Sequence, residues 1–412
     1  MQVVEQHIIS KSDPRYESID AVAFASKNLY NAALYELRQA FIFQGISLHY
    51  QELYHRMKTH QAYKALPAKV AQQVLKHLDQ AWQSYFAACE AWHADPSKFL
   101  GHPKLPKYKD KQKGRNLLVY TVQAVSKRGL KRGLIQPSGL PIGVQTKQQI
   151  IDQVRIVPRI GFYVVEVVYE QQEQAALVNP ALMAAIDIGV NNLVALTSNK
   201  RGFVPCLVNG RPLKSTNQYY NKRRAQLQKK LGTTGTTRRM ERLTTKRSRR
   251  LDHYLHTASR RIIDLLVEEG IGTLIIGKNV FWKQECQLRK KDKQHFVQLP
   301  HARFIDQLCY KAKLVGIQVL ITEESYTSQA SFLDGDPMPT YGKVEEEPTF
   351  SGRRLKRGLY RAKSGKRFNA DVNGSYNILR KAAPDAFAGK GVEDVVVHPV
   401  RFPVQSSKSR MV

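Results

Sequence analysis

The feature that most constrains this chain is an apolar run, M-A-A-I, that ends in Asp187 and is followed by I-G. Such a run is typical of a buried strand, and it presents Asp187 at the C-terminal edge of the sheet, where open α/β sheets bind ligands. Glu323 and Glu324 follow a second apolar run, V-L-I-T, and Asp371 lies at the start of a helix predicted over 372–381. Carboxylate oxygens of this kind form sites for hard cations such as Mg²⁺.

The charge of the chain indicates a polyanionic partner. Its 412 residues include 65 Lys and Arg against 34 Asp and Glu, which gives a net charge of +31. Each phosphate that such a protein neutralises releases counterions, so nucleic acid is the natural partner. The 42% hydrophobic content fits globular domains rather than a disordered basic tail. A basic ribosomal protein would have a similar charge, so charge identifies the class of partner and not the activity.

The cysteines and the N-terminus predict an intracellular protein. The four cysteines are too far apart for a C-x-x-C motif and suggest no disulfide framework. We expect ordinary thiols at Cys89, Cys206, Cys286 and Cys309. No signal peptide opens the chain and no apolar stretch is long enough to span a bilayer, so we expect a cytoplasmic protein, associated with the nucleoid when bound to DNA.

Hydrophobic periodicity divides the N-terminal part into strands and helices. A strand is predicted near residues 3–9, helices over 19–92, and a Pro- and Lys-rich connector over 102–115. Tyr108, among the connector's lysines, is a candidate for base stacking. Further strands are predicted at 117–122, 133–136, 153–157 and 162–169.

The C-terminal part alternates strands and helices. A strand–turn–strand is predicted over 182–197, and a long basic helical region over 214–269 is interrupted at 232–237. We then expect a strand at 273–276, a helix at 296–315, a strand at 316–322, irregular structure over 326–369 and a helix at 372–381, with an extended tail from Gly389. This order is the one expected of an RNase H-like α/β layer fold.

Several motifs resemble the TnpB (OrfB) proteins of insertion sequences, which are relatives of the type V CRISPR effectors. They are S-K-N-L-Y-N-A-A-L-Y, K-L-P-K-Y-K, A-I-D-I-G-V-N-N-L-V-A, Y-K-A-K-L-V-G-I-Q-V, Y-T-S-Q-A-S and N-A-D-V-N-G-S-Y-N-I-L-R-K-A, in this order along most of the chain. The resemblance implies an RNA-guided DNA endonuclease encoded by a transposon. Its guide RNA would come from the transposon end, and it would cut double-stranded DNA beside a short adjacent motif.

The resemblance also implies a fold class, α/β plus α+β, with an RNase H-like (RuvC) nuclease domain that is split in the sequence. An N-terminal helical recognition lobe and a β-barrel wedge domain would precede it. The expected parts are a lobe at 1–178 with a helical insertion near 20–100, a first nuclease part at 179–326, a target-nucleic-acid-binding insertion at 327–368, a last nuclease helix at 369–384 and a tail at 385–412.

The chain departs from the family pattern at a catalytic position. Family members place a glutamate at the end of the strand that here ends in Gly277, which cannot bind a metal. Glu323 and Glu324 end the following strand. If the two strands are neighbours, about 4.8 Å apart, a glutamate side chain can reach the same site. Side chains alternate along a strand, so at most one of the pair faces the metal, and we favour Glu324.

A second departure concerns the family's zinc ribbon. Where cysteines are usual, this chain has approximately Ser331 and Asp334, and then Arg361 and Ser364. A Cys₄ zinc site is impossible without thiolates, so we predict no structural zinc.

Together these features predict a site in which Asp187, Glu324 or Glu323, and Asp371 are both the catalytic residues and the ligands of two Mg²⁺ ions about 4 Å apart. Cations over 238–250 would contact the backbone of guide or heteroduplex. The sequence does not determine the oligomeric state, although a monomer is favoured. The alternatives are a nuclease-inactive, RNA-guided DNA-binding protein that acts like a repressor and, less consistent with the motifs, a basic RNA-packaging or ribosome-associated protein.

Overall fold

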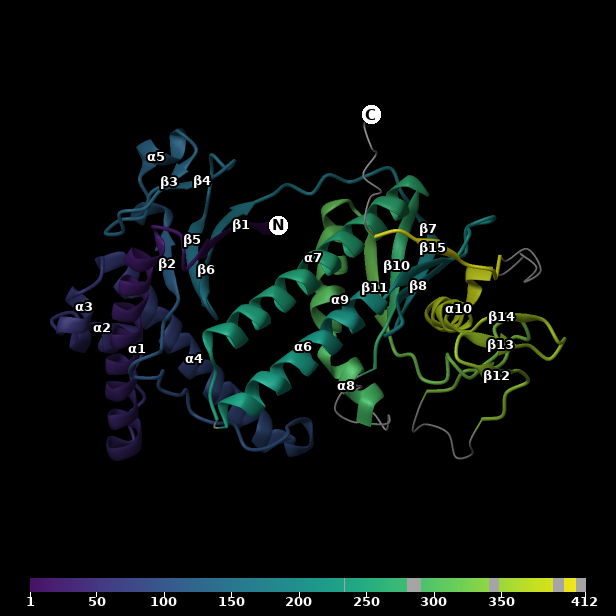
Figure 1. Ribbon diagram of the computed structural model, residues 1–412, viewed down its shortest axis with the longest axis horizontal. Helices are drawn as coiled ribbons and strands as arrows, with labels where there is room; N and C mark the ends of the chain where they lie inside the picture. Colours follow the sequence, from purple (N-terminus) through teal and green to yellow (C-terminus); the bar gives the residue numbers. More distant parts are fainter. Residues whose placement is uncertain (233, 280–289, 341–347, 388–395, 405–412) are drawn as a thin grey trace. The chain divides into compact units, whose positions relative to one another are not determined.

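The computed structural model describes residues 1–232, 234–279, 290–340, 348–387 and 396–404. Within them the chain divides into two compact units, Met1–Gln171 and Gln172–Val412 (Figure 1). In the described helices, none is both long and apolar enough to cross a membrane. Cys89, Cys206 and Cys309 carry free thiols, and Cys286 lies outside the described residues.

The first unit combines an antiparallel sheet with a helical bundle. Its sheet has the order β1-β6-β5-β2, and a separate short hairpin joins β3 to β4. The helices are α1 (Tyr16–Gln44), α2 (Tyr50–Met57), α3 (Gln61–Lys64), α4 (Ala68–Ala94) and α5 (Lys127–Lys131); the 3₁₀ helices are Pro96–Lys98 and Val122–Ala124. The strands are β1 (Gln2–Ser10), β2 (Leu118–Thr121), β3 (Leu134–Ile135), β4 (Val144–Gln145), β5 (Gln153–Arg159) and β6 (Phe162–Glu170).

Two apolar cores hold this unit together. One lies between the sheet, the start of α1 and the β3–β4 hairpin, and the other lies between α1, α2, α3 and α4. In the helical core, the ring of Phe41 contacts those of Trp82 and Phe86 edge-on, at centroid distances of 5.8 and 5.4 Å. Edge-to-face packing of this kind suits the quadrupole of aromatic rings. The predicted strands and helices of residues 3–92 and 117–170 are confirmed as elements.

The second unit is built on one mixed six-stranded sheet in the order β11-β10-β7-β8-β9-β15. Its strands are β7 (Asn179–Ile188), β8 (Asn192–Ser198), β9 (Cys206–Asn209), β10 (Ile271–Gly277), β11 (Gln318–Thr322) and β15 (Val400–Phe402). Its helices are α6 (Arg211–Leu231), α7 (Arg238–Glu268), α8 (Lys290–Gln298), α9 (His301–Leu314), α10 (Ala370–Ala382) and the 3₁₀ helix Pro384–Phe387. A small sheet of β12 (Arg353–Lys356), β13 (Leu359–Arg361) and β14 (Arg367–Asn369) lies before α10.

Helices cover both faces of the large sheet (Figure 1). Residues Ala184 and Ile186 of β7 join the core formed with α7 and α9, whereas Ala185 packs against Ile378 and Leu379 of α10. Alternate residues of a strand face opposite sides, so the faces of β7 are fixed by this packing. This places Asp187, two residues after Ala185, on the α10 face.

Two details of this unit differ from the sequence predictions, and a third goes beyond them. The helix predicted over 296–315 is two helices, because Pro300 has no N–H to continue the first. The region predicted as irregular over 326–369 contains β12, β13 and β14, which are too short and too polar to show a strand pattern. The extended tail pairs in parallel with β9 through β15, a long-range contact with no local signal.

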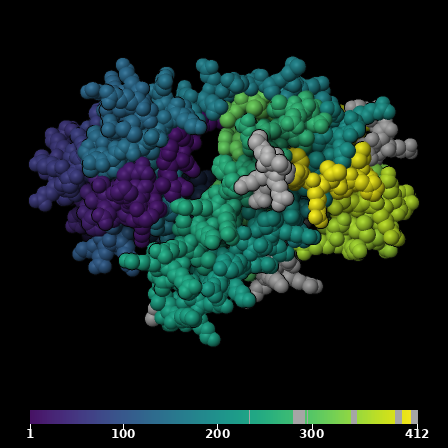
Figure 2. Space-filling model, turned by 45° about the horizontal axis from the view of Figure 1, so that its top comes forward, coloured from purple at the N-terminus to yellow at the C-terminus, as the bar shows by residue number. Residues whose placement is uncertain are grey.

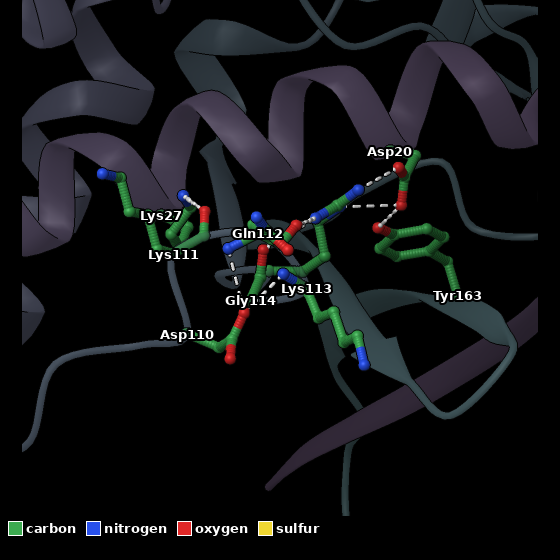
Figure 3. Close-up of polar contacts among 9 residues, drawn as sticks. Asp20, Lys27, Asp110, Lys111, Gln112, Lys113, Gly114 and Tyr163 are labelled. Carbon is green, nitrogen blue, oxygen red and sulfur yellow. Dashed lines mark hydrogen bonds and ion pairs between the residues drawn. The ribbon is translucent and has the colours of Figure 1, made fainter. Parts of the chain in front are cut away.

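The Lys-rich connector of the first unit is fastened to α1 by charged groups (Figure 3). Arg115 donates to both carboxylate oxygens of Asp20, at 2.9 and 2.6 Å, and the Tyr163 hydroxyl donates to the same carboxylate at 2.6 Å. The buried Lys27 ammonium donates to the carbonyl of Lys111 at 2.7 Å. Burial alone would raise the pKa of Asp20, but the bonds from Arg115 and Tyr163 outweigh it and lower that pKa.

We expect Asp20→Ala to lower the free energy of unfolding by about 2 kcal/mol, because Arg115 and Tyr163 lose their charged acceptor. The lowered pKa means that this contribution is present above the unfolded pKa, about 4, and is lost as the pH falls below it. Urea unfolding at pH 7 and pH 3 would show the difference from wild type shrinking at pH 3. Glu17→Ala, an exposed change in the same helix, is the control, and an equal effect of both would contradict the prediction.

Candidate functional site

Strand register brings Asp187 beside Gly277 on one face of the sheet. β7 and β10 are parallel neighbours, with Ile186 opposite Ile276. Ala185 and Ile275, one residue before this pair, both pack against α10. By alternation, Asp187 and Gly277 face α10 as well.

Glu324 follows the edge strand β11, and its side chain lies beside Gly277. β10 and β11 are parallel neighbours, with Gly277 opposite Thr322, which confirms the premise that these two strands are adjacent. A Cβ atom placed on Gly277 would lie 2.7 Å from Oε2 of Glu324 and 2.6 Å from Cδ1 of Ile378. The Glu324 carboxylate therefore lies over Gly277, in the space that a side chain on the middle strand would fill.

Asp371 enters from the first turn of α10. The side chain of Asn369 caps this helix by accepting from the N–H groups of Asp371 and Val372, at 2.9 and 3.2 Å. The Asp371 carboxylate accepts from Asn192 Nδ2 at 2.7 Å and lies 3.4 Å from the Arg354 guanidinium. An amide and a cation thus already hold this carboxylate at the C-terminal edge of the sheet.

A second glycine allows the helix to approach Asp187. A Cβ atom on Gly374 would lie 2.7 Å from Oδ2 of Asp187. The sequence reasoning did not single out Gly374, although a glycine inside a helix costs about 1 kcal/mol relative to alanine and so signals a packing or functional reason. The sequence shows at Gly277 only a missing ligand, whereas the structure shows that its missing side chain makes room for Glu324.

The charges of Glu324 and Asp371 both act on the buried Asp187 carboxyl. Burial, then the charges of Glu324 and Asp371, raise the pKa of Asp187 well above its ordinary value, and Arg354 opposes the rise. Burial and the adjacent Glu323 carboxylate raise the pKa of Glu324 to about 7. Neighbouring buried carboxylates favour binding either a proton or a cation, because the positive charge compensates the repulsion between their negative charges.

Glu323 turns away from this cluster. One of its oxygens lies 2.5 Å from Lys381 Nζ of α10, and the other accepts from the Ser325 N–H at 2.7 Å. Of the four residues proposed from the sequence, Glu324 and Asp371 lie near enough to Asp187 to act on it through their charges, whereas Glu323 contacts a lysine.

The donor set of the three carboxylates fits a hard cation. It offers only oxygens, the ligands that Mg²⁺ prefers. Within the described ranges, no three His, Cys, Asp or Glu side chains stand together as a ready-made metal site. Asp187, Glu324 and Asp371 are thus neighbours that interact through their charges and would have to draw closer to share an ion.

Carboxylates tie together the turns around Ser331, Asp334 and Lys363, where the resemblance predicted that zinc-binding cysteines are missing. Asp334 accepts from the Ser331 hydroxyl at 2.5 Å and from the Lys363 N–H at 2.8 Å. The buried Asp336 accepts from the N–H groups of Ser331 and Ser351, at 2.7 and 3.0 Å, and from the Ser351 hydroxyl at 2.6 Å. These hydrogen bonds, with the buried rings of Tyr360 and Phe368 nearby, hold the turns together without thiolates.

The long basic helices present cations to solvent. α6 and α7 pack together, with Arg247 lying over the Tyr220 ring at 5.0 Å and donating to Asn217 at 2.6 Å. Gly232, in the left-handed conformation at φ 69°, ends α6. In the space-filling view the teal residues of these helices lie on the surface (Figure 2). The exposed cations of α7 in the basic run are Arg238, Arg239, Arg242, Lys246, Arg249 and Arg250.

In the first unit, the stacking candidate Tyr108 is 45% exposed, and the Arg38 guanidinium lies 4.9 Å from its ring centroid. A ring held by a cation and open to solvent has the form of a base-stacking platform.

We expect Asp336→Ala to lower the free energy of unfolding of the second unit by about 3 kcal/mol, because the buried Ser331 N–H and the N–H and hydroxyl of Ser351 lose their acceptor. Asp385→Ala, an exposed change, is the matched control. A zinc chelator should leave the thermal midpoint of the wild type unchanged, and a fall of several degrees on chelation would contradict the carboxylate cross-link.

Comparisons with known proteins agree with these observations. The family model OrfB_IS605, described as a probable transposase, matches residues 166–283, and the model of the Cas12f1-like TNB domain matches residues 301–378. The TnpB-like protein ORF457 of Acidianus two-tailed virus is 25% identical in an alignment 425 positions long. The alignment covers 93% of this chain and 85% of that protein.

A cryo-EM structure of a Cas12f1–sgRNA–target DNA complex contains a protein chain of similar fold. Its TM-score is 0.50 at 16% sequence identity, over 88% of this chain and 82% of that chain. The likeness supports a mixed α/β fold of the compact Cas12f kind. The two family models and the viral relative show that much of the chain is similar to TnpB (OrfB) proteins.

Proposed function

We propose that this chain is an RNA-guided DNA endonuclease, encoded by a transposon, that cleaves target DNA next to a short adjacent motif by Mg²⁺-dependent phosphodiester hydrolysis. The nuclease core would be a RuvC-type, RNase H-like domain built on the six-stranded sheet, and the first unit would hold the recognition helices and the wedge. The Cas12f1 relative is described in complex with sgRNA and target DNA. Nuclease activity is the property that such relatives suggest for this chain.

The observation that carries the proposal is the position of Glu324 over Gly277, on the sheet face that also bears Asp187. It supports a complete set of Asp, Glu and Asp ligands, although the usual glutamate position holds glycine. The carboxylate oxygens are the ligands that Mg²⁺ prefers, and two ions bound there would lower the pKa of a water nucleophile and stabilise the leaving 3′-oxygen. Asp187, Glu324 and Asp371 would hold them, and Asn192 would orient Asp371 through its 2.7 Å hydrogen bond.

Cationic surfaces of the second unit suit the nucleic acids. A hollow of about 480 Å³ in the insertion is lined by Arg353, Arg361 and Lys363 together with the Ser351 and Ser364 hydroxyls. These groups match the oxygens of a phosphate backbone. We assign residues 327–368 to the target nucleic acid, the exposed cations of α7 to the guide or heteroduplex backbone, and the protein to the prokaryotic cytoplasm as a monomer.

We expect Asp187→Ala, Asp371→Ala and Glu324→Ala each to lower the rate of guided plasmid cleavage by at least about 100-fold, because each removes charge stabilisation at the reacting phosphate. Transposon-end RNA is co-expressed, Mg²⁺ is supplied, and RNA binding by the variants should remain at the wild-type level. If Asp187→Ala and Asp371→Ala still cut, the assigned site is wrong.

The same experiment tests the alternative of a nuclease-inactive, RNA-guided DNA-binding protein. That alternative was motivated by Gly277, and the position of Glu324 removes its main argument. Guided binding of target DNA by a wild type that does not cut it would support the alternative and overturn the endonuclease.

The space over Gly277 predicts the behaviour of a swapped pair. Gly277→Ala should slow cleavage about 10-fold or more, because its Cβ atom would displace the Glu324 carboxylate. Gly277→Glu combined with Glu324→Gly should cut faster than either single variant, because one carboxylate again lies over the middle strand. Gly101→Ala, where nothing lies within 4 Å, is the control; wild-type cleavage by Gly277→Ala would show that Glu324 is not the ligand.

A further inference from the structure

One polar face of α10 fastens the chain that follows Glu324. Asn373, Asn377 and Lys381 are spaced four residues apart and so lie on the same side of the helix. Asn373 donates to the Ala330 carbonyl at 2.8 Å, and Asn377 donates to the Thr327 and Ala330 carbonyls at 2.9 and 2.7 Å. Both amide side chains are fully buried. The helix that carries Asp371 thus also holds the backbone beyond Glu324.

Lys381 is the member of this face that reaches the strand end itself. Its ammonium donates to the carbonyls of Ser325 and Pro339, at 3.0 and 3.3 Å, and lies 2.5 Å from a Glu323 oxygen. Only 12% of the lysine side chain is exposed. A charge so covered is costly to leave unpaired, so the pair with Glu323 is held in one geometry.

The backbone of Glu324 is fixed from both sides. Its N–H donates to Asn279 Oδ1 at 2.9 Å, and its carbonyl accepts from the Thr327 hydroxyl at 2.8 Å. Glu323 contributes through the 2.7 Å bond from the Ser325 N–H to its second oxygen. With Glu323 turned to α10, the side chain of Glu324 is left to lie over Gly277.

We propose that Lys381 and Glu323 form a positioning pair that fixes Glu324 for metal binding beside Asp187 and Asp371. The inference rests on the proposed function, because it concerns the same carboxylate site. It assigns Glu323 a structural partner instead of a metal. Neither Lys381 nor Glu323 touches the reacting phosphate; both act through Glu324.

The test compares four variants of the full chain bound to its guide RNA. Lys381→Met removes the charge and keeps the length, Lys381→Arg keeps the charge, Glu323→Gln removes the partner's charge, and the fourth combines Lys381→Met with Glu323→Gln. Lys313→Met is the matched control, because it removes an exposed ion pair with Glu173 at 3.5 Å. Two quantities are measured: the Mg²⁺ concentration for half-maximal cleavage, and the rise of the thermal midpoint produced by Mn²⁺.

We expect Lys381→Met and Glu323→Gln to raise the half-activating Mg²⁺ concentration 10- to 100-fold, the usual effect of losing a group that orients a metal ligand. The Mn²⁺-induced rise of the midpoint should shrink in the same variants. Lys381→Arg should stay within about threefold of wild type, and the double variant should be no worse than the more damaging single one, because one interaction is lost only once. Guide RNA binding and the Lys313→Met control should be unchanged.

If Lys381 has a purely structural role, Lys381→Met should have a lower thermal midpoint at every metal concentration but keep the wild-type Mg²⁺ requirement and the full Mn²⁺-induced rise. That result would overturn the inference. Failure of the proposed function is distinguishable. A wild type that Mn²⁺ stabilises but that does not cut refutes the endonuclease while the Mn²⁺ readout still decides the role of Lys381. A wild type that shows neither response refutes both.

Discussion

The arrangement of the second unit depends on bringing like-charged carboxylates together at a largely buried place. Burial raises the pKa of both Asp187 and Glu324, and the charges of Glu324 and Asp371 raise that of Asp187 further. The fold supports this arrangement with rigid elements: Asp187 lies in a central strand and Asp371 in the first turn of a capped helix. Sites built on strands and helices are held more accurately than sites built on loops.

The close approach of these elements is possible because two positions have no side chain. Gly277 makes room for the carboxylate of Glu324, and Gly374 makes room for that of Asp187. Each glycine weakens its own strand or helix slightly, since it adds no packing and costs backbone entropy. The packing and backbone entropy lost at Gly277 and Gly374 are therefore tied to the close approach of the carboxylates. A larger residue at either position would prevent that approach.

Much of this organisation was predictable from local patterns, and the reasons for the failures are physical. The apolar run before Asp187 and the periodic helix after Asp371 are strong signals, and both elements lie where the sequence predicted them. The three short strands between 353 and 369 gave no such signal, since they are polar and pair only with one another. Nor does any local pattern show that Lys381 faces Glu323, because 58 residues separate them in the chain and only the packing of α10 brings them together.

Gly277 shows why a proposed metal-binding position cannot be judged from one residue. In a parallel sheet the ends of neighbouring strands lie side by side, so a carboxylate can be supplied to one place by either of two strands. Supplying the carboxylate from the edge strand instead of the middle strand requires two features at once. The edge strand must end in a glutamate, and the middle strand must lack a side chain at the facing position. Residues in contact are energetically coupled, so neither feature alone gives the effect of both. The glycine at 277 and the glutamate at 324 are therefore best understood as one structural unit, in which the absence of a side chain at the first is what permits the carboxylate of the second to lie over the middle strand.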